Sequence, residues 1–362
     1  MKKIVKFLLI ILMVFSVVAC GSKTDDGSST DDGSDTSDLP LAGKKIAYVY
    51  NGTPTDIFVM ADDAARNVIE SLGGTYTYQS TDADDAKFQD YAYNFANQGY
   101  DGILLSHGSK EYMADLVKDL NDNYGMAVVT FDSQFVDANG NTITVDGVTQ
   151  MFQDDAGMAE MLLNYALDEL YPEKETINVL KLWKGPGISP FDRRQTAYVK
   201  FEENGSVNTL EVVTASSEAE YYTAIDSIIK NYDVGDVDVI WSCYDAYGRG
   251  AYQALLDNNR TGDVKLVSVD ISNQDINYML DGNNSWMACA CVDFTLIGDQ
   301  GMRLVAMKLH GDEVESLYEL TPSLIRATDL KEGANVNNLS EYISSYGDCD
   351  DHNPDWIAEY VH

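Results

Sequence analysis

Polar and aromatic side chains follow the ends of several short apolar segments in this 362-residue sequence. Such segments are typical of strands in an open α/β sheet, where ligands bind beyond the carboxyl ends of the strands. The groups found there are carboxylates, an amide, a hydroxyl, aromatic rings and an arginine pair. The candidate binding residues are Asn51, Phe58, Ser106, Asp132, Trp183, Arg194, Tyr244, Asp245, Asp270 and Asp293.

This set of groups suits a ligand rich in hydroxyl groups. Carboxylates and amides exchange hydrogen bonds with hydroxyls, and flat aromatic rings can cover the C–H faces of a sugar. Trp183 and Tyr244 are the better ring candidates because each lies at the tip of a predicted strand. Phe58 also has the helical spacing of a core residue, and Asp245 has a simpler interpretation as a helix N-cap.

Arg193 and Arg194 open a predicted helix. The helix dipole disfavours cations at that end. A ligand or a carboxylate partner is therefore expected to stabilise at least one of them.

Motifs for metal or nucleophilic catalysis are absent from the sequence. HExxH, Walker A and GxSxG patterns do not occur, and the four histidines form no ligand cluster. Residues 137–148 contain calcium-ligand types, but Thr142 and Val148 stand where a calcium loop requires Gly and Glu. We therefore expect no enzyme activity, metal or cofactor.

Two successive strand–helix series must position these residues. Because their strands are continuously apolar, both faces are expected to be covered by helices, which predicts parallel doubly wound sheets. An Asn139-Gly140 turn predicts a hairpin within 134–150, and residues 320–362 have few periodic signals. The strands are expected at 46–50, 75–79, 102–106, 127–131, 177–183, 210–214, 237–242, 264–270 and 288–292, with helices of the second series near 155–170, 190–204, 218–231 and 246–258.

The first 19 residues have the composition of an export signal. Three lysines precede an apolar run at 7–18 that is too short for a permanent membrane span, which takes about 20 residues. Residues 17–20, VVAC, resemble the lipobox of bacterial lipoproteins, whose cysteine becomes the lipid-bearing N-terminus. We therefore expect a lipid such as palmitate on Cys20 and an anchored chain at the extracytoplasmic face of the cell membrane; an ordinary secretory signal is the alternative.

Acidic and small polar residues dominate the next segment and the whole chain. Residues 21–40 have no aliphatic side chain before Leu39, so we expect a disordered tether. The formal net charge is −35, which excludes nucleic acid and anionic lipid as partners because phosphate binding needs clustered Lys and Arg. The four remaining cysteines form no CxxC pair and are expected to be buried free thiols.

Segment 44–310 carries a series of motifs that resembles one known family. They are KKIAYVYNGTPTDIFVMADDAARNVIESLG, DGILLS, AVVTFDS, RRQTAYVKF, VDVIWSCYDAYGRGAYQAL and VKLVSVDIS, in this order. Together they resemble the periplasmic-binding-protein type I family, the sugar-binding receptors of ABC transporters. The resemblance implies two Rossmann-like lobes, joined by a three-strand hinge, that close on a sugar.

The resemblance also implies roles for individual residues. The family's hydroxyl-binding Asp falls on Asp132, its helix-opening Arg on Arg194 and the Asp of its GxD strand on Asp270. Its Asn-Asp pair falls on Tyr244-Asp245, the polar residue at the last crossover near Asp293 and the aromatic wall near Phe58. Departures at Ser133, Tyr244 and Ile57 put ribose itself in doubt, although a polyhydroxylated ligand still fits.

We therefore expect a monomeric solute-binding receptor of an ABC importer that passes a small carbohydrate to a membrane permease. A nucleoside or furanosyl-signal receptor and a sensory receptor for a histidine kinase are the alternatives. Related repressors carry a DNA-binding helix-turn-helix, whose place is taken here by the signal and the tether. The expected parts are a signal peptide (1–19), the lipidated Cys20 with its linker (20–42), an N-terminal lobe (43–150 and 294–320) and a C-terminal lobe (151–293 and 321–362).

Overall fold

The computed structural model of the protein describes residues 38–54, 56–347 and 349–362. The expected signal peptide, Cys20 and most of the acidic linker lie outside the described residues. None of the described helices is long and apolar enough to cross a membrane.

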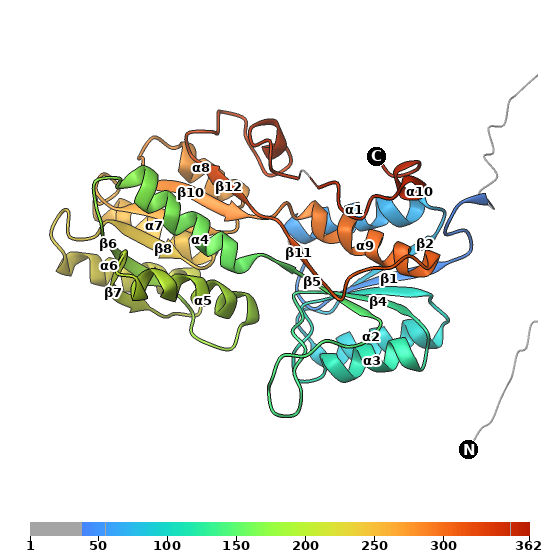
Figure 1. The fold of residues 1–362 in the computed structure, drawn as a ribbon. Helices are drawn as coiled ribbons and strands as arrows, with labels where there is room; N and C mark the ends of the chain where they lie inside the picture. The colour runs from blue at the N-terminus through green and yellow to red at the C-terminus, as the bar shows by residue number, and fades with distance from the viewer. Residues whose placement is uncertain (1–37, 55, 348) are drawn as a thin grey trace, which may run out of the picture. The chain divides into compact units, whose positions relative to one another are not determined.

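The N-terminal lobe is a parallel sheet of six strands with helices on both faces (Figure 1). Its strand order is β11-β5-β4-β3-β1-β2. In β1, Tyr48 faces the core that contains α1 and α9, whereas Ala47 and Val49 face the core that contains α2 and α3. The elements are β1 (Lys45–Tyr50), α1 (Asp56–Ser71), β2 (Thr75–Ser80), α2 (Asp85–Asn97), β3 (Gly102–Ser106), α3 (Met113–Asp122), β4 (Ala127–Phe131), β5 (Val148–Gln153), α9 (Thr295–His310) and β11 (Leu317–Leu320).

The C-terminal lobe repeats this plan with the strand order β12-β10-β9-β8-β6-β7. All its pairings are parallel except that of β12 with β10. The elements are α4 (Asp155–Tyr165), which continues as the π-helical turn Ala166–Leu170, β6 (Ile177–Leu182), α5 (Ser189–Glu203), β7 (Val207–Val213), α6 (Glu218–Ile228), β8 (Val239–Ser242), α7 (Asp245–Asp257), β9 (Lys265–Val269), α8 (Asn273–Leu280), β10 (Trp286–Cys291) and β12 (Ser323–Arg326).

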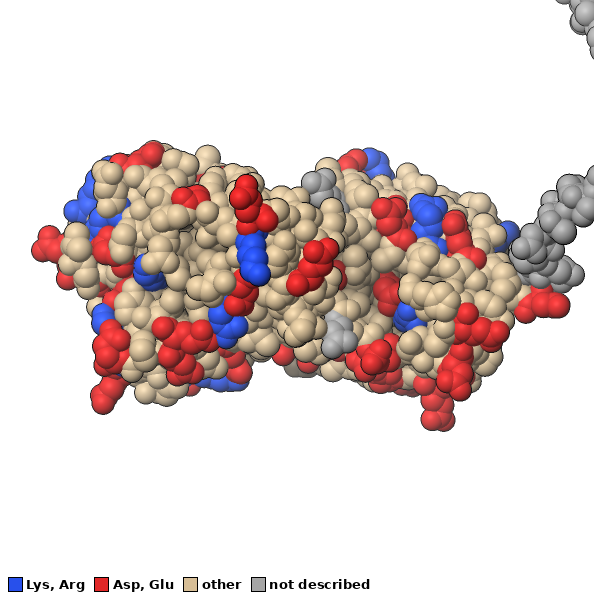
Figure 2. All heavy atoms as spheres, turned by 90° about the horizontal axis from the view of Figure 1, so that it is seen from above, with Lys and Arg blue, Asp and Glu red and all other residues tan. Residues whose placement is uncertain are grey.

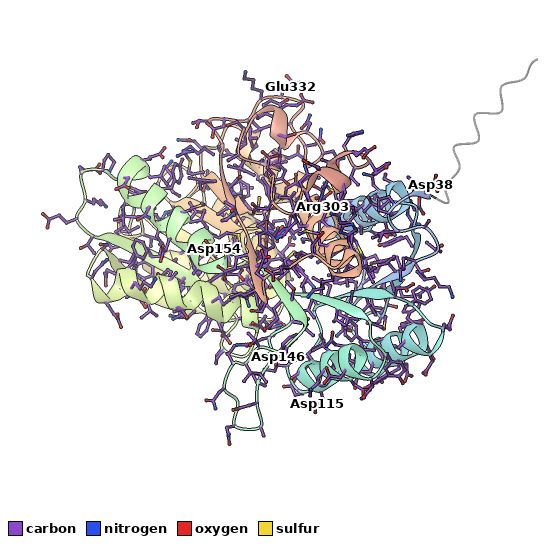
Figure 3. The ribbon with its side chains drawn as sticks, turned by 45° about the vertical axis from the view of Figure 1, so that its right-hand side comes forward. Asp38, Asp115, Asp146, Asp154, Arg303 and Glu332 are labelled. Carbon is purple, nitrogen blue, oxygen red and sulfur yellow. The ribbon has the colours of Figure 1, made fainter. Side chains whose placement is uncertain are left out.

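Three crossings connect the strands of the two sheets, at Asp154, at 292–294 and at 321–322, and the C-terminal segment later returns from the C-terminal to the N-terminal lobe. Asp154 lies at the passage from β5 to α4, between the two groups of elements (Figure 3). The two-lobe, doubly wound fold that the sequence predicts is therefore confirmed.

The lobe boundaries differ from the expected ones at two places. β5 pairs with β4 and β11, so the first crossing lies after Gln153 rather than after residue 150. The C-terminal segment is divided, because Tyr346 packs in the core of the C-terminal lobe and Ile357 in that of the N-terminal lobe. The expected hairpin within 134–150 is reduced to one isolated bridge, between Val136 and Thr142.

The four described cysteines are free thiols, and charged side chains of both signs lie on the surface (Figure 2). Cys243, Cys289 and Cys291 are buried free thiols, whereas Cys349 is free and half-buried. Figure 2 shows acidic and basic side chains interspersed over the face that it presents.

Helices α1 and α9 approach each other so closely that one position between them requires glycine. An added Cβ at Gly298 would lie 1.8 Å from the carbonyl oxygen of Ala61. We predict that Gly298→Ala lowers the free energy of unfolding by about 3 kcal/mol, at the upper end of the usual cost of overpacking, in urea denaturation. Gly262→Ala, whose added Cβ meets nothing within 4 Å, is the control, and equal stabilities of the two variants would contradict this account of the helix contact.

Candidate functional site

A cavity of about 270 Å³ lies between the carboxyl ends of the two sheets. The N-terminal lobe contributes Tyr50, Ile57, Phe58, His107, Phe131, Asp132, Gln153, Phe294 and Ile297 to its lining, and the C-terminal lobe contributes Ile188, Pro190, Phe191, Arg194, Tyr244 and Asp270. The cavity is therefore mainly apolar, with a few carboxylate, amide and guanidinium groups.

The wall from the N-terminal lobe is a cluster of rings. Phe58 is stacked on Tyr50 at a centroid distance of 4.0 Å, and His107 meets both rings edge-on at 5.3 and 5.4 Å. Burial, assisted by the charge of Arg193, lowers the pKa of His107 to about 4. The imidazole is therefore neutral at pH 7 and belongs to an uncharged surface.

Asp132 follows β4 with a positive φ of 46° and points its carboxylate at the opposite lobe. Its Oδ1 accepts a hydrogen bond from Arg193 Nη2 at 2.5 Å, and Gln153 Nε2 lies 3.4 Å from Oδ2. Burial raises the pKa of Asp132, although Arg193 acts in the opposite direction. This ion pair joins the two lobes directly.

Asp155, the first residue of α4, holds both members of the arginine pair. Its Oδ1 accepts from Arg194 Nε at 2.7 Å, and its Oδ2 accepts from Arg193 Nε at 2.8 Å and Nη2 at 2.5 Å. Burial raises the pKa of Asp155 to about 6 despite both cations. A carboxylate partner therefore accounts for two cations at the beginning of α5, as the sequence requires.

Arg194 and Asp270 form the polar floor on the side of the C-terminal lobe. Arg194 is 1% exposed; its Nη1 donates to the Cys243 carbonyl at 2.5 Å and lies 3.5 Å from Asp270 Oδ2. The other oxygen of Asp270, Oδ1, is buried without a hydrogen-bond partner. Burial raises the pKa of Asp270 to about 7. An unpartnered buried acceptor at a cavity wall is a strong position for a ligand hydroxyl.

A second cavity of about 340 Å³ adjoins the first and shares Ile57, Tyr244 and Asp270 with it. Asp245 lies here, and its Oδ2 accepts from Arg249 Nη1 at 2.6 Å. Six of the ten predicted residues therefore line one cavity or both, namely Phe58, Asp132, Arg194, Tyr244, Asp245 and Asp270.

The other four predicted residues line neither cavity. Asn51 donates to Asp85 Oδ1 at 2.8 Å and thereby joins the loop after β1 to the first residue of α2. Ser106 is fully buried and bonds His107 Nδ1 at 2.6 Å. Asp293 accepts from the backbone of Thr295 at 2.9 Å, at the beginning of α9.

Trp183 is the clearest departure from the expected positions. Its ring packs against the core of the C-terminal lobe, and Lys181 Nζ lies 5.3 Å from the ring centroid. The location of Trp183 at the end of a strand therefore does not determine that its ring faces the cleft.

Several residues at the site, Tyr50 and His107 among them, are not in the set predicted from the sequence. Gln153 is the last residue of β5 and Asp155 is the first residue of α4, in a stretch where no strand was predicted; Phe191 and Arg193 lie in α5 beside Arg194. The rule that selected Asp132, namely a polar residue just after a strand, selects Asp155 once β5 is recognised, whereas Gln153 is the last residue of that strand.

Metal ligation is not supported by the described part of the chain. Within residues 38–54, 56–347 and 349–362, no group of three or more His, Cys, Asp or Glu side chains is placed to hold a metal ion.

A family model described as "Periplasmic binding protein domain" matches residues 46–313. Among curated proteins, the Fructose import binding protein FruE of Bifidobacterium longum (strain NCC 2705) is 24% identical over 332 residues, which are 90% of this chain and 94% of that protein. These matches span both lobes.

Solved structures agree with the family model. A sugar ABC transporter protein from Yersinia enterocolitica subsp. enterocolitica 8081 is 33% identical with a TM-score of 0.74, over 88% of this chain and 95% of that one. A 5-methylthioribose transporter solute-binding protein from Thermotoga lettingae TMO, solved with 5-methylthioribose, is 21% identical with a TM-score of 0.74, over 89% and 97%.

The raised pKa of Asp270 makes stability depend on pH. Folding favours the protonated carboxyl, so its contribution is fully present below about pH 4, the ordinary pKa of an aspartate, and is lost as the pH rises to about 7. We predict that ligand-free Asp270→Asn gains stability relative to the wild type from pH 5 to pH 7, by at most about 1.4 kcal/mol per pH unit, in urea denaturation.

The exposed Asp146, labelled in Figure 3, provides the matched control. Asp146→Asn should follow the wild-type pH dependence. A constant difference between Asp270→Asn and the wild type over this range would show that Asp270 is not the group responsible.

Proposed function

The chain belongs to the periplasmic binding protein domain family, and from this we propose that it is an extracytoplasmic solute-binding receptor of an ABC importer that binds a small carbohydrate between its lobes. The observation that carries the proposal is the pair of carboxylates, Asp132 from one lobe and Asp270 from the other, at one ring-walled cavity. The family is one of solute-binding proteins, which supports a receptor rather than an enzyme.

Hydrogen-bonding groups in the cavity match the dual character of hydroxyls, which both donate and accept. Asp270 Oδ1 and Gln153 Oε1 are buried acceptors without partners. Arg194 supplies donors on the same side as Asp270. Sugar hydroxyls can satisfy both kinds of group at once, whereas an apolar solute would leave them unpaired at a cost of about 1–3 kcal/mol each.

The apolar part of the lining suits the other face of a sugar. Phe58 and His107 on one side and Tyr244 and Phe191 on the other present rings to the cavity. The volume of about 270 Å³ lies just below the ~300–1,000 Å³ of sites for drug-sized ligands. One monosaccharide ring is the appropriate size. The fructose and 5-methylthioribose named for two relatives support a carbohydrate.

Transport follows from closure of the lobes around the ligand. Three crossings form a hinge, and a ligand that contacts both lobes stabilises the closed form. The Arg193–Asp132 ion pair already spans the cleft and adds to that closed form. The closed receptor then delivers the carbohydrate to the permease of the importer.

We extend the proposal to the lipid on Cys20 and to a monomeric receptor at the outer face of the cell membrane. The VVAC segment and the acidic residues after it support an anchored and tethered domain. Labelling with a radioactive fatty acid should mark the wild-type protein and not Cys20→Ala. Equal labelling of both would show that the lipid is on another residue, and no labelling of the wild type would show that it is absent.

The carbohydrate site is tested by calorimetric titration with neutral monosaccharides and nucleosides. We predict that at least one monosaccharide binds at pH 8, above the raised pKa of Asp270. Asp132→Asn and Asp270→Asn should each weaken this binding at least tenfold, since a hydrogen bond to a charged group contributes about 1.5–3 kcal/mol. Asp146→Asn, outside the cavity, should bind as the wild type does. Binding of a nucleoside but of no sugar would contradict the proposed ligand class.

A further inference from the structure

The second cavity continues the carbohydrate site rather than forming a separate one. It holds about 340 Å³ beside the 270 Å³ of the first, and both are lined by Ile57, Tyr244 and Asp270. The buried, unpartnered Asp270 Oδ1 therefore belongs to the wall that the two cavities have in common. A ligand that satisfies this oxygen lies where the first cavity opens into the second.

The walls of the second cavity have the mixed character of a binding surface. Tyr244 and Ile271 supply apolar area, and Val336 adds to it from the segment after β12. Asn273 fixes that segment, because its Oδ1 accepts from the Val336 backbone at 2.9 Å. Gln274 is an exposed residue of the same wall, so polar groups that exchange hydrogen bonds with hydroxyls are present as well.

The charge of the second cavity excludes an anionic substituent. Its one arginine, Arg249, is surrounded by carboxylates: Nη1 lies 2.6 Å from Asp245 Oδ2 and 3.2 Å from Asp275 Oδ1, and Nε lies 3.2 Å from Glu218 Oε2. Burial raises the pKa of Asp275 to about 8, so Asp245 and Glu218 are the carboxylates that neutralise the guanidinium, and no positive charge is left for a phosphate or an acidic sugar. The chemistry that remains is that of a neutral hydroxylated group.

We infer that the second cavity is a subsite for the part of the ligand beyond the first ring, so that the ligand is a neutral disaccharide-sized glycoside. The inference rests on the proposed carbohydrate function and narrows its ligand class. The first ring lies among Phe58, Asp132 and Arg194, the glycosidic link lies beside Asp270 and Tyr244, and the second ring lies against Val336 and Gln274.

The competing explanation is that the second cavity is only an entrance to the first cavity. An entrance needs no fixed polar groups, yet Asp245 is 6% exposed and is held by Arg249. Asp275 in turn is bonded by the N-cap residue Ser272, which orients the beginning of α8. These contacts give the wall the preorganised form of a site that binds part of a ligand.

The test is calorimetric titration of the purified full chain with pairs of neutral sugars. Fructose is compared with sucrose, galactose with lactose and melibiose, and arabinose with arabinobiose, and fructose 6-phosphate probes the charge. We expect one disaccharide to bind at least tenfold more tightly than its constituent monosaccharide, and the phosphate to bind no more tightly than fructose.

Variants of α8 identify the subsite itself. Gln274→Trp fills the second cavity and should remove the disaccharide's advantage while monosaccharide binding is retained. Asn277→Trp, an exposed position of the same helix that does not line the cavity, is the matched control and should retain both.

Three outcomes would overturn the inference. Disaccharides that bind no more tightly than their monosaccharides show that the ligand ends in the first cavity. Equal loss of both ligands in Gln274→Trp, but not in Asn277→Trp, shows that the second cavity is an entrance. If no sugar binds at all, the carbohydrate function fails, and the subsite with it.

Discussion

The carboxylate of Asp155 is the contact on which the binding site depends. It bonds Arg193 on one oxygen and Arg194 on the other, and these reach Asp132 and Asp270 respectively. The three carboxylates are nearly excluded from water, and Arg194 is as well. Removing one partner of such a network leaves an uncompensated buried charge, which costs about 3–5 kcal/mol. The cavity floor is therefore fixed as one unit.

The position of Asp155 connects this network to the hinge. The residue follows directly after the first crossing, so a rotation at Asp154 moves the carboxylate that orients both arginines. Arg193 contacts Asp132 across the cleft and Asp155 within its own lobe. Opening must break the first of these bonds and leaves the second intact. The C-terminal half of the site is thus preorganised, and closure completes it with Asp132.

Asp132, Tyr244 and Asp270 could be predicted from the sequence because the strands before them, β4, β8 and β9, are recognisable as short apolar segments. The selection of polar residues after apolar strands failed where a buried strand does not have a continuously apolar sequence. β5, with the sequence VTQMFQ, is buried throughout but contains Thr and two Gln. Because its residues are not continuously apolar, the strand was not predicted, and Asp155 after it was not selected. Trp183 was wrongly predicted to face the cleft. The direction of its ring depends on packing with Lys181 and the core of the C-terminal lobe, which the local sequence does not specify.

The C-terminal segment adds a mechanical element to this hinged molecule. Its residues Leu339 and Tyr346 are part of the core of one lobe, and Ile357 and Val361 are part of the core of the other. The lobes are therefore joined by a fourth stretch of chain, which begins beside the crossings: Ser345 Oγ lies 3.0 Å from Ser323 Oγ, and a Cβ added at Gly347 would lie 2.5 Å from Asp293 Oδ2. When the lobes separate, the chain between Tyr346 and Ile357 must either extend or pull one end out of its core. Its length, at most about 3.5 Å per residue, sets the widest opening that the folded receptor can reach.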